Sequence, residues 1–335
     1  MVRPAIVFRV DCNTQTGFGH FSRSLNLCRN MIMSKSFGWN NFIFVGDLND
    51  FAKALLTSFN IQFLRVSSIK EEKGFNLEAL NLKCTAVILD SYDLTQESLN
   101  NYSNIFQQTI IIDDTCELDY SNIDLVINFR HCAEDIFSYN AKETALGLNY
   151  FFTKPELTHI RTTNQKKFNQ SKKFNQSINN ILLFMGGGYK KSDNIFHIIS
   201  SMQSSAPSAS IYCVSDQALP KVTNVTWLKP SPNIEKLLAS CDVCINGGGL
   251  IKYEAAFCCI PTASFSTTKL QDEDTQILTK SGFISNLGLD GAQESIYLAD
   301  MLKNPEIREN LVMTCSKKFN IISSEALLKK IQAVL

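Results

Sequence analysis

The 335-residue sequence has no excess charge of either sign, because 32 lysines and arginines are matched by 32 aspartates and glutamates. A basic surface for nucleic acid is therefore not expected, and we predict a small-molecule partner held by local groups. The sequence also lacks an apolar run long enough to span a bilayer. Its first residues lead directly into a strand-like segment instead of a signal peptide. We therefore expect a cytoplasmic protein with no membrane span, and we favour a monomer.

Histidine is scarce, with four residues in the chain, whereas cysteine is frequent, with eleven. In a cytoplasmic protein these cysteines are expected to stay reduced. Cys241 and Cys244, like the adjacent pair 258–259, lie in apolar segments, so we predict small core residues instead of zinc ligands. We predict neither a metal ion nor a cofactor.

Short apolar runs alternate with helix-like segments along both halves of the chain. This rhythm predicts parallel sheets covered by helices, that is, an α/β fold with two Rossmann-like domains and a shared cleft. We place the first domain at 1–153 and the second at 181–335, and we allow the terminal helix to pack back on the first domain. The polar segment 154–180 contains a direct repeat and is predicted to be a boundary loop or linker.

The start of the chain holds the motif around which the rest is interpreted. The apolar run 6–10 predicts a buried strand, and the apolar spacing after His20 predicts a helix. Between them, Gly17 and Gly19 allow a tight turn and a close approach to a ligand. The third glycine of the dinucleotide fingerprint is missing. An imidazole where the loop becomes the helix is suited to moving a proton. The simpler alternative is a helix-start residue beside a tight turn.

Acidic residues close two predicted strands of the first half, namely Asp90 and the pair Asp113–Asp114. They lie at the carboxyl ends of their strands, which is the edge where open α/β sheets bind ligands. We therefore expect a ligand crevice at this edge of the sheet.

Two glycine triplets follow predicted strands in the second half. They are Gly186-Gly187-Gly188 and Gly247-Gly248-Gly249. The helix start after the second triplet offers backbone N–H groups that favour a phosphate. Glu254 lies in that helix, where a carboxylate can accept hydrogen bonds from ribose hydroxyls. The alternatives are a flexible turn for the first triplet and an ordinary first-turn acid for Glu254.

Over most of the chain and in the same order, these segments resemble the nucleotide-sugar hydrolases of pseudaminic acid biosynthesis. The resemblance rests on residues 9–11 with 17–23, 90–94, 112–114, 146–150, 185–188 and 246–254, and on the segment around Gln276. A more distant resemblance is to the glycosyltransferase that adds N-acetylglucosamine to lipid-linked muramyl peptide.

The resemblance implies a two-domain GT-B fold that binds UDP mainly in the second domain. It implies hydrolysis of UDP-2,4-diacetamido-2,4,6-trideoxy-β-L-altrose to the free sugar and UDP without a metal, with His20 as the general base for water. The substrate-binding residues that it implies are Arg9, Asp11, Gly17, Gly19, Arg23, Tyr92, Thr275 and Gln276. The UDP-binding residues that it implies are the two glycine triplets with Leu250 and Glu254. Asp11 is expected to orient His20 or to contact the sugar.

The chain departs from the family's pattern after Gly188, where Tyr189 stands near an expected aspartate, and at Thr275, where an asparagine is expected. Two alternatives therefore stay open. One is a glycosyltransferase on the same scaffold, in which an acceptor hydroxyl replaces water. The other is a catalytically silent protein that binds a nucleotide sugar.

Overall fold

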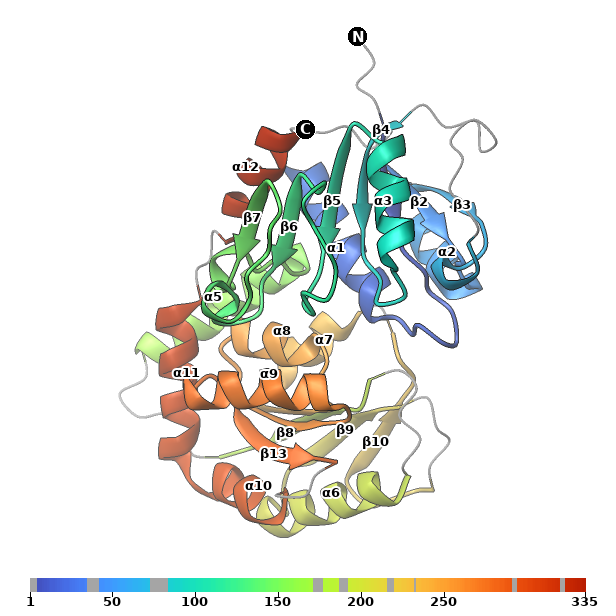
Figure 1. Ribbon diagram of the computed structural model, residues 1–335. Coiled ribbons are helices and arrows are strands. Elements are labelled where there is room, and N and C mark those ends of the chain that lie inside the picture. The colour runs from blue at the N-terminus through green and yellow to red at the C-terminus, as the bar shows by residue number, and fades with distance from the viewer. Residues whose placement is uncertain are drawn as a thin grey trace. The chain divides into compact units, whose positions relative to one another are not determined.

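The computed structural model describes residues 5–34, 42–72, 84–170, 177–186, 192–215, 220–231, 233–290, 294–319 and 323–335. The chain divides into two compact units. The first joins Met1–Lys154 to Asn320–Leu335, and the second is Pro155–Phe319. Each unit holds one parallel sheet with helices packed against it (Figure 1). The predicted α/β class with two Rossmann-like domains is thereby confirmed.

The sheet of the first unit has seven described strands. They are β1 (Ala5–Arg9), β2 (Phe42–Gly46), β3 (Gln62–Arg65), β4 (Cys84–Leu89), β5 (Gln108–Ile112), β6 (Leu125–Asn128) and β7 (Glu143–Leu146). Their order in the sheet is β3-β2-β1-β4-β5-β6-β7, with every pair parallel. The direction in which strands are added therefore reverses between β1 and β4.

Five helices and two short 3₁₀ turns belong to the described part of the first unit. They are α1 (Gly19–Met33), α2 (Asp50–Ser58), η2 (Ile69–Glu71), α3 (Gln96–Ile105), α4 (Ala133–Ile136), η3 (Leu148–Tyr150) and α12 (Ser323–Val334). Helix α12 comes from the end of the chain and packs on α1 and η3. Its residues Leu327 and Ile331 are fully buried, and Lys330 Nζ lies 3.0 Å from Glu143 Oε2.

The second unit repeats the arrangement with six described strands. They are β8 (Asn180–Phe184), β9 (Ser210–Val214), β10 (Val225–Leu228), β11 (Val243–Asn246), β12 (Thr262–Ser266) and β13 (Ser285–Leu289). The parallel order β10-β9-β8-β11-β12-β13 reverses between β8 and β11. The helices are α5 (Pro155–Gln170), α6 (Ser192–Ser205), α7 (Ile234–Ser240), α8 (Ile251–Phe257), α9 (Lys269–Lys280), α10 (Glu294–Lys303) and α11 (Pro305–Lys318).

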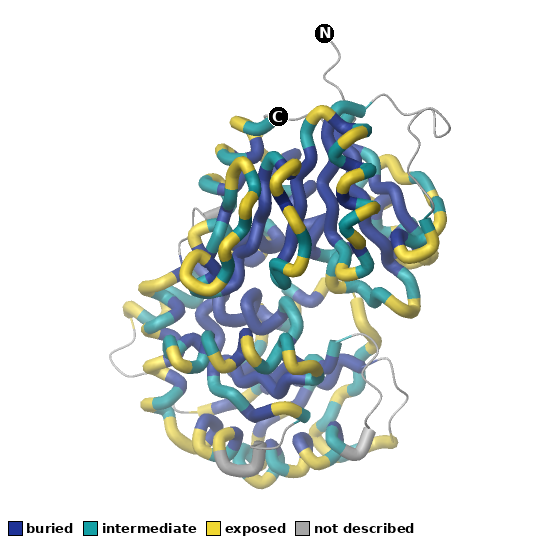
Figure 2. The backbone as a smooth tube through the Cα atoms, in the orientation of Figure 1, coloured by how far each residue is buried: buried dark blue, intermediate teal, exposed yellow. Residues whose placement is uncertain are grey.

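The central strands are buried and the helices expose one side, as Figure 2 shows by colour. In the first unit, Phe8 of β1 lies in register with Phe44 of β2, and their rings stack at 4.9 Å. Full burial of such a side chain contributes about 2 kcal/mol to stability. Side-chain caps start several helices: Asn49 accepts a hydrogen bond from Ala52 N, and Thr95 and Ser98 form a capping box.

The structure differs from the sequence expectations at two places. The segment expected to be a loop or linker holds helix α5, which buries Leu157, Ile160 and Arg161 although most of its residues are polar. The Arg161 guanidinium donates to the carbonyls of Phe257 at 2.6 Å and Phe319 at 2.7 Å, and these bonds fix the polar helix in place. Strand β7 was not predicted, because only two of its four residues are apolar.

Some expectations lie outside the described residues, among them a helix at 77–82. Within the described residues, none of the helices combines the length and the hydropathy needed to cross a bilayer.

Candidate active site

His20 and Asp90 meet where the first sheet reverses its strand order. His20 is the second residue of α1, which follows β1, and Asp90 comes directly after β4, the neighbouring strand. His20 Nδ1 lies 2.6 Å from Asp90 Oδ1. Ligand sites in open α/β sheets form at such a reversal, outside the carboxyl ends of the strands. The sequence pattern predicted the position of His20, but it did not predict this partner.

Asp90 is fully buried and is held by α1 on both carboxylate oxygens. Arg23, one turn after His20, donates from Nε to Oδ2 at 2.9 Å and from Nη2 to Oδ1 at 2.5 Å. Ser24 donates to Oδ2 at 3.2 Å. Burial opposes ionisation, but the charge of Arg23, followed by that of His20, holds the pKa of Asp90 below its usual value. Asp90 is therefore a carboxylate.

The geometry around Asp90 assigns the tautomer of His20. Arg23 Nη2 also lies 3.2 Å from Nδ1, because Nη2 and Nδ1 share the same Asp90 oxygen. The shorter contact, to the carboxylate, fits an Nδ1–H donor. The lone pair of the neutral ring is then on Nε2, and the imidazole side chain is 15% exposed. The ring is thus arranged as a proton acceptor with a fixed orientation.

Tyr92 and Asp114 extend the cluster along the sheet edge. The rings of His20 and Tyr92 meet edge to face with centroids 4.5 Å apart. The Tyr92 hydroxyl donates to Asp114 Oδ2 at 3.1 Å, and Arg23 Nη1 lies 3.7 Å from the same oxygen. Tyr92 as a whole is 55% exposed, but desolvation of its hydroxyl and the charge of Asp114 raise its pKa, so the hydroxyl remains protonated at neutral pH. His20, Arg23 and Tyr92, all expected from the sequence, are therefore neighbours.

Arg9 and Asp11 belong to a separate buried network. Arg9 is completely buried and binds Asp11 Oδ1 at 2.8 Å, Glu72 Oε2 at 2.6 Å and the Tyr102 hydroxyl at 3.0 Å. Asp11 accepts further hydrogen bonds from the backbone of Asp47 at 2.9 Å and Ile69 at 2.7 Å. These bonds occupy both side chains, so we interpret them as structural. Of the two aspartates, it is Asp90 that contacts the His20 ring, whereas these hydrogen bonds hold Asp11 in the Arg9 network.

Gly17 lies in the turn before α1, and Gly19 is the first residue of α1, next to His20 in the sequence. Gly17 has a φ of +69°, which few side chains adopt without strain. Asn13 closes the turn by accepting hydrogen bonds from the backbone of Gln15 at 2.8 Å and Thr16 at 2.9 Å. A methyl group at Gly17 or Gly19 would meet nothing within 4 Å, so there is open space at both positions.

The glycine triplet 247–249 lies at the corresponding reversal of the second sheet. Gly247 N donates to Phe184 O at the end of β8 at 3.0 Å. Gly248 has a φ of +78°, and Asn246 Oδ1 accepts its N–H at 3.1 Å. A methyl group at Gly248 would lie 3.2 Å from Ser266 Cα, whereas one at Gly249 would meet nothing within 4 Å. The triplet therefore brings the backbone close to β12 on one side and to open space on the other.

The other predicted UDP contacts are placed around this loop. Gly186 follows β8 with a φ of +77° and open space at its Cα, while Gly187 and Gly188 lie outside the described residues. Leu250 precedes α8, and Glu254, within α8, is only 4% exposed. Little of Glu254 is therefore accessible to a ribose.

Residues that the sequence analysis missed connect α8 to α9. Lys252 Nζ, 2% exposed, pairs with Asp274 Oδ2 at 2.8 Å and donates to Gln271 O at 3.3 Å. Gln271 Oε1 accepts from Thr267 N at 3.0 Å and would lie 3.4 Å from a methyl group at Gly248. Gln271, in the first turn of α9, is thus beside the glycine triplet. The sequence signal was an amide five residues before Gln276, in the same helix.

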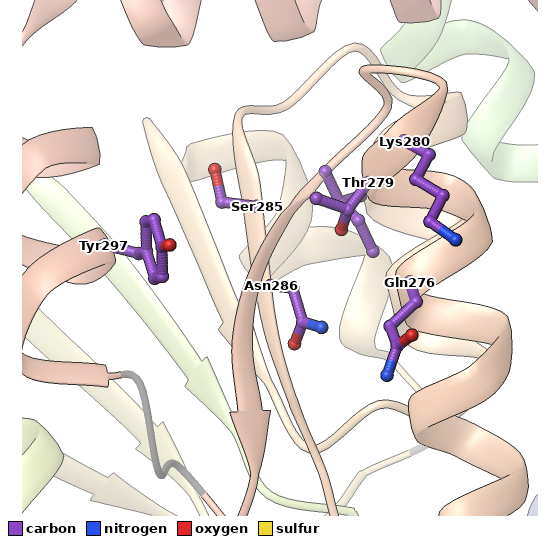
Figure 3. A pocket seen from close by; sticks show the side chains of 7 residues that line it. Gln276, Thr279, Lys280, Ser285, Asn286 and Tyr297 are labelled. Carbon is purple, nitrogen blue, oxygen red and sulfur yellow. The ribbon is translucent and has the colours of Figure 1, made fainter.

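The side chains of Thr275 and Gln276 lie in different surroundings, although the two residues are neighbours in α9. Thr275 is fully buried, and its hydroxyl is bonded to Lys252 at 3.1 Å and Ser266 at 3.1 Å. Gln276 is exposed and lines a surface cavity of about 320 Å³ between α9, the start of β13 and α10 (Figure 3). The cavity residues are Gln276, Thr279, Lys280, Ile284, Ser285, Asn286 and Tyr297. Since Ser285 begins β13, this cavity faces away from the carboxyl ends of the strands, where the glycine triplet lies.

Of the four cysteines predicted as core residues, Cys244, Cys258 and Cys259 are buried, whereas Cys241, directly after α7, is partly exposed. Cys244 lies in β11 and Cys258 follows α8, both fully buried, and burial raises the pKa of both thiols. Among the described residues, no group of three or more His, Cys, Asp or Glu side chains is arranged to hold a metal ion.

The sequence matches no protein-family model and no curated protein. The structure, in contrast, is similar to many solved structures. A UDP-GlcNAc 2-epimerase from Neisseria meningitidis bound to UDP-GlcNAc has a TM-score of 0.58 at 13% identity, over 98% of this chain and 100% of that one.

MurG from Acinetobacter baumannii has a TM-score of 0.62 at 12% identity, over 98% and 100% of the two chains. HepE from Anabaena, in complex with UDP and glucose, has a TM-score of 0.57 at 14% identity, over 99% and 100%. The chain has the GT-B fold. At these identities the similarity establishes the fold alone.

Proposed function

We propose that this GT-B protein cleaves a UDP-sugar by attack of water on the anomeric carbon, with His20 as the general base. The observation that carries the proposal is the 2.6 Å contact between His20 Nδ1 and the buried, ionised Asp90 at the reversal of the first sheet. A base oriented by a carboxylate, with its other nitrogen available, is what activation of water requires.

In the proposed reaction, Nε2 takes a proton from water while the water oxygen bonds to the anomeric carbon. The bond between that carbon and the diphosphate oxygen breaks, and its electron pair leaves with UDP. The products are the free sugar and UDP. The configuration at the anomeric carbon is inverted, because water attacks from the face opposite to the leaving UDP. The imidazolium that forms is stabilised by Asp90 at Nδ1.

The diphosphate is proposed to bind at the second reversal. The triplet 247–249 lets phosphate oxygens approach the backbone, and open space at Gly249 leaves room for them. Backbone N–H groups there would stabilise the charge that develops on the leaving UDP. Glu254 is proposed to hold the ribose and Gln271 to contact the diphosphate or the sugar.

The sugar is proposed from the sequence resemblance, which favours a 2,4-diacetamido-2,4,6-trideoxyhexose. A glycosyltransferase on the same scaffold is the second candidate. The structural similarity to MurG supports this candidate. In such a reaction, His20 would activate an acceptor hydroxyl instead of water.

The test is to incubate the purified protein with UDP-GlcNAc and with the UDP-diacetamido sugar and to measure UDP release without an acceptor. In water labelled with ¹⁸O, label in the sugar shows cleavage at the anomeric carbon, and label in UDP shows attack on phosphorus. His20→Ala is expected to lower the release rate by about 10²–10⁴-fold. The matched control is His159→Ala, which removes an exposed histidine from α5.

UDP release that requires an acceptor would replace the hydrolase with the transferase. Tight UDP binding without turnover of either kind would leave a binding protein. Release that survives in His20→Ala would remove the histidine from the mechanism.

A further inference from the structure

A second carboxylate, Asp114, lies near the His20–Asp90 pair and contacts two of its neighbours, Tyr92 and Arg23. It follows β5, the strand next to β4, and its Oδ2 receives the Tyr92 hydroxyl at 3.1 Å and faces Arg23 Nη1 at 3.7 Å. Its Oδ1 is buried and has no hydrogen-bond partner among the described residues. Leaving a buried carboxylate oxygen unbonded costs free energy, so a purely structural role would leave this arrangement unexplained.

The contacts form a closed arrangement of two rings, two carboxylates and one guanidinium. Asp90 holds the ring of His20, Asp114 holds the ring of Tyr92, and the two rings touch at 4.5 Å. Arg23 lies between the two carboxylates and has its Nη2 3.2 Å from His20 Nδ1. The positive charge nearest to the imidazole is thus shared between two acids.

We infer that Asp114 is a positioning residue, which balances Arg23 so that His20 can accept a proton and which fixes Tyr92 against the imidazole. The inference rests on the proposed function for its purpose, but not for its measurement. With Asp90 alone, one carboxylate would face both Arg23 and the protonated imidazole. With Asp114 present, the charge of Arg23 is partly neutralised and the imidazolium is less strongly repelled.

The charged and titratable groups around His20 come from every neighbouring element. Arg23 on α1 and Asp90 and Tyr92 after β4 contact the imidazole, and Asp114 after β5 contacts Arg23 and Tyr92. Arg130 after β6 lies beyond Asp114, where its Nη1 donates to the Asp114 carbonyl at 3.0 Å. Removal of the Asp114 charge leaves the two arginines in place. The protonated ring then becomes less stable.

The test follows the His20 ring signals by NMR as pH is varied, in the full-length protein without ligand. The signals are assigned by their loss in His20→Gln. The midpoint of the His20 titration is expected to move to lower pH in Asp114→Asn and to return to the wild-type position in Asp114→Glu. Glu97→Gln, which removes an exposed acid from α3, is the matched control and should leave the midpoint unchanged.

A midpoint in Asp114→Asn equal to that in Glu97→Gln would overturn the inference. If Asp114→Asn does not fold, Asp114→Ser is titrated in its place, with the same expectation. With substrate, kcat/KM is expected to fall about tenfold in Asp114→Asn, and the acid limb of its pH profile should move in the same direction. Because the titration needs no substrate, it can succeed or fail whether or not the protein hydrolyses a UDP-sugar.

Discussion

The two sheets of this protein reverse their strand order in the same way, yet the two reversals hold different chemistry. Between β1 and β4 lie charged and aromatic side chains, joined by the contacts of Asp90 and Arg23. At the second reversal, where β8 and β11 are neighbours, a turn of three glycines follows β11. Without side chains, this turn offers its backbone N–H groups to a ligand. The comparison teaches that one topology supplies two kinds of site. Side chains suit proton transfer, whereas bare backbone suits a phosphate.

At the reversal between β1 and β4, the largest effect is expected from a change at Asp90. Asp90→Asn removes the charge that holds His20 and Arg23, so UDP release is expected to fall by about 10²–10³-fold. Asp93→Asn, in the same turn, is the control. In the double variant with His20→Ala, little further loss is expected, since the two residues act as one unit. Losses that multiply would show that Asp90 acts independently of the imidazole.

A change at Arg9, in the buried network of the same unit, tests whether this residue serves stability or ligand binding. Arg9→Met leaves Asp11 and Glu72 without their cation, so the free energy of unfolding is expected to fall by about 3 kcal/mol or more. Arg65→Met removes an exposed arginine that pairs with Asp47, and it should cost less than about 1 kcal/mol. Urea unfolding measures both. UDP affinity is expected to stay within about twofold of wild type, and a large loss of affinity in a folded Arg9→Met would return Arg9 to the binding site.

At the reversal between β8 and β11, two variants each add one methyl group, at adjacent glycines. Gly248→Ala strains a backbone at φ +78° and places the methyl group 3.2 Å from Ser266 Cα. UDP affinity, measured by calorimetry, is expected to fall about tenfold. Gly249→Ala meets no neighbouring atom within 4 Å, so the loop keeps its shape. Its own effect then reports whether a bound phosphate occupies that open space, and a normal affinity in Gly248→Ala would argue against the loop.

The ionised state of Asp90 also predicts how stability varies with pH. Its pKa is lowered in the folded protein, so the unfolded chain takes up the proton at a higher pH. The stabilisation is therefore complete above the usual aspartate pKa of about 4 and is lost as pH falls through the folded value. The difference in urea midpoint between wild type and Asp90→Asn should shrink between neutral and acidic pH. A difference that is constant over this range would contradict the assignment.

The smallest expected effect distinguishes two glutamines of α9. Gln271→Ala removes an amide beside Gly248, and UDP-sugar affinity is expected to fall about fivefold, the size of one hydrogen bond. Gln276→Ala alters the surface cavity near the start of β13 and should change affinity by less than about twofold. The reverse order of effects would support the substrate-binding role that the family resemblance implies for Gln276.

Local patterns were enough to predict much of the fold, because buried strands and glycine turns are encoded by neighbouring residues. The loop before α1 and the position of His20 follow from such a pattern. The partner of His20 does not, because Asp90 is brought there by the pairing of β1 with β4, and periodicity does not reveal strand order. Asp11 was closer in the sequence and had the same chemistry, but it is enclosed by the Arg9 network.

Two other features that the sequence did not reveal have similar physical causes. Helix α5 was expected to be a loop because its composition is polar, whereas Arg161 anchors it through carbonyl groups far along the chain. Thr275 is buried and Gln276 exposed because adjacent residues of a helix point about 100° apart. A motif that is read as a pair along the chain is thus divided between the core and the surface.

The packing of α12 on α1 has a consequence for how the protein is made. The first unit needs helix α12, which follows the whole second unit in the sequence, so its fold is incomplete until α12 has been translated. Helix α1, which begins at the candidate base, gains its final support only then. A ribosome that stops before α12 would release a chain with every proposed active-site residue present and one supporting helix absent.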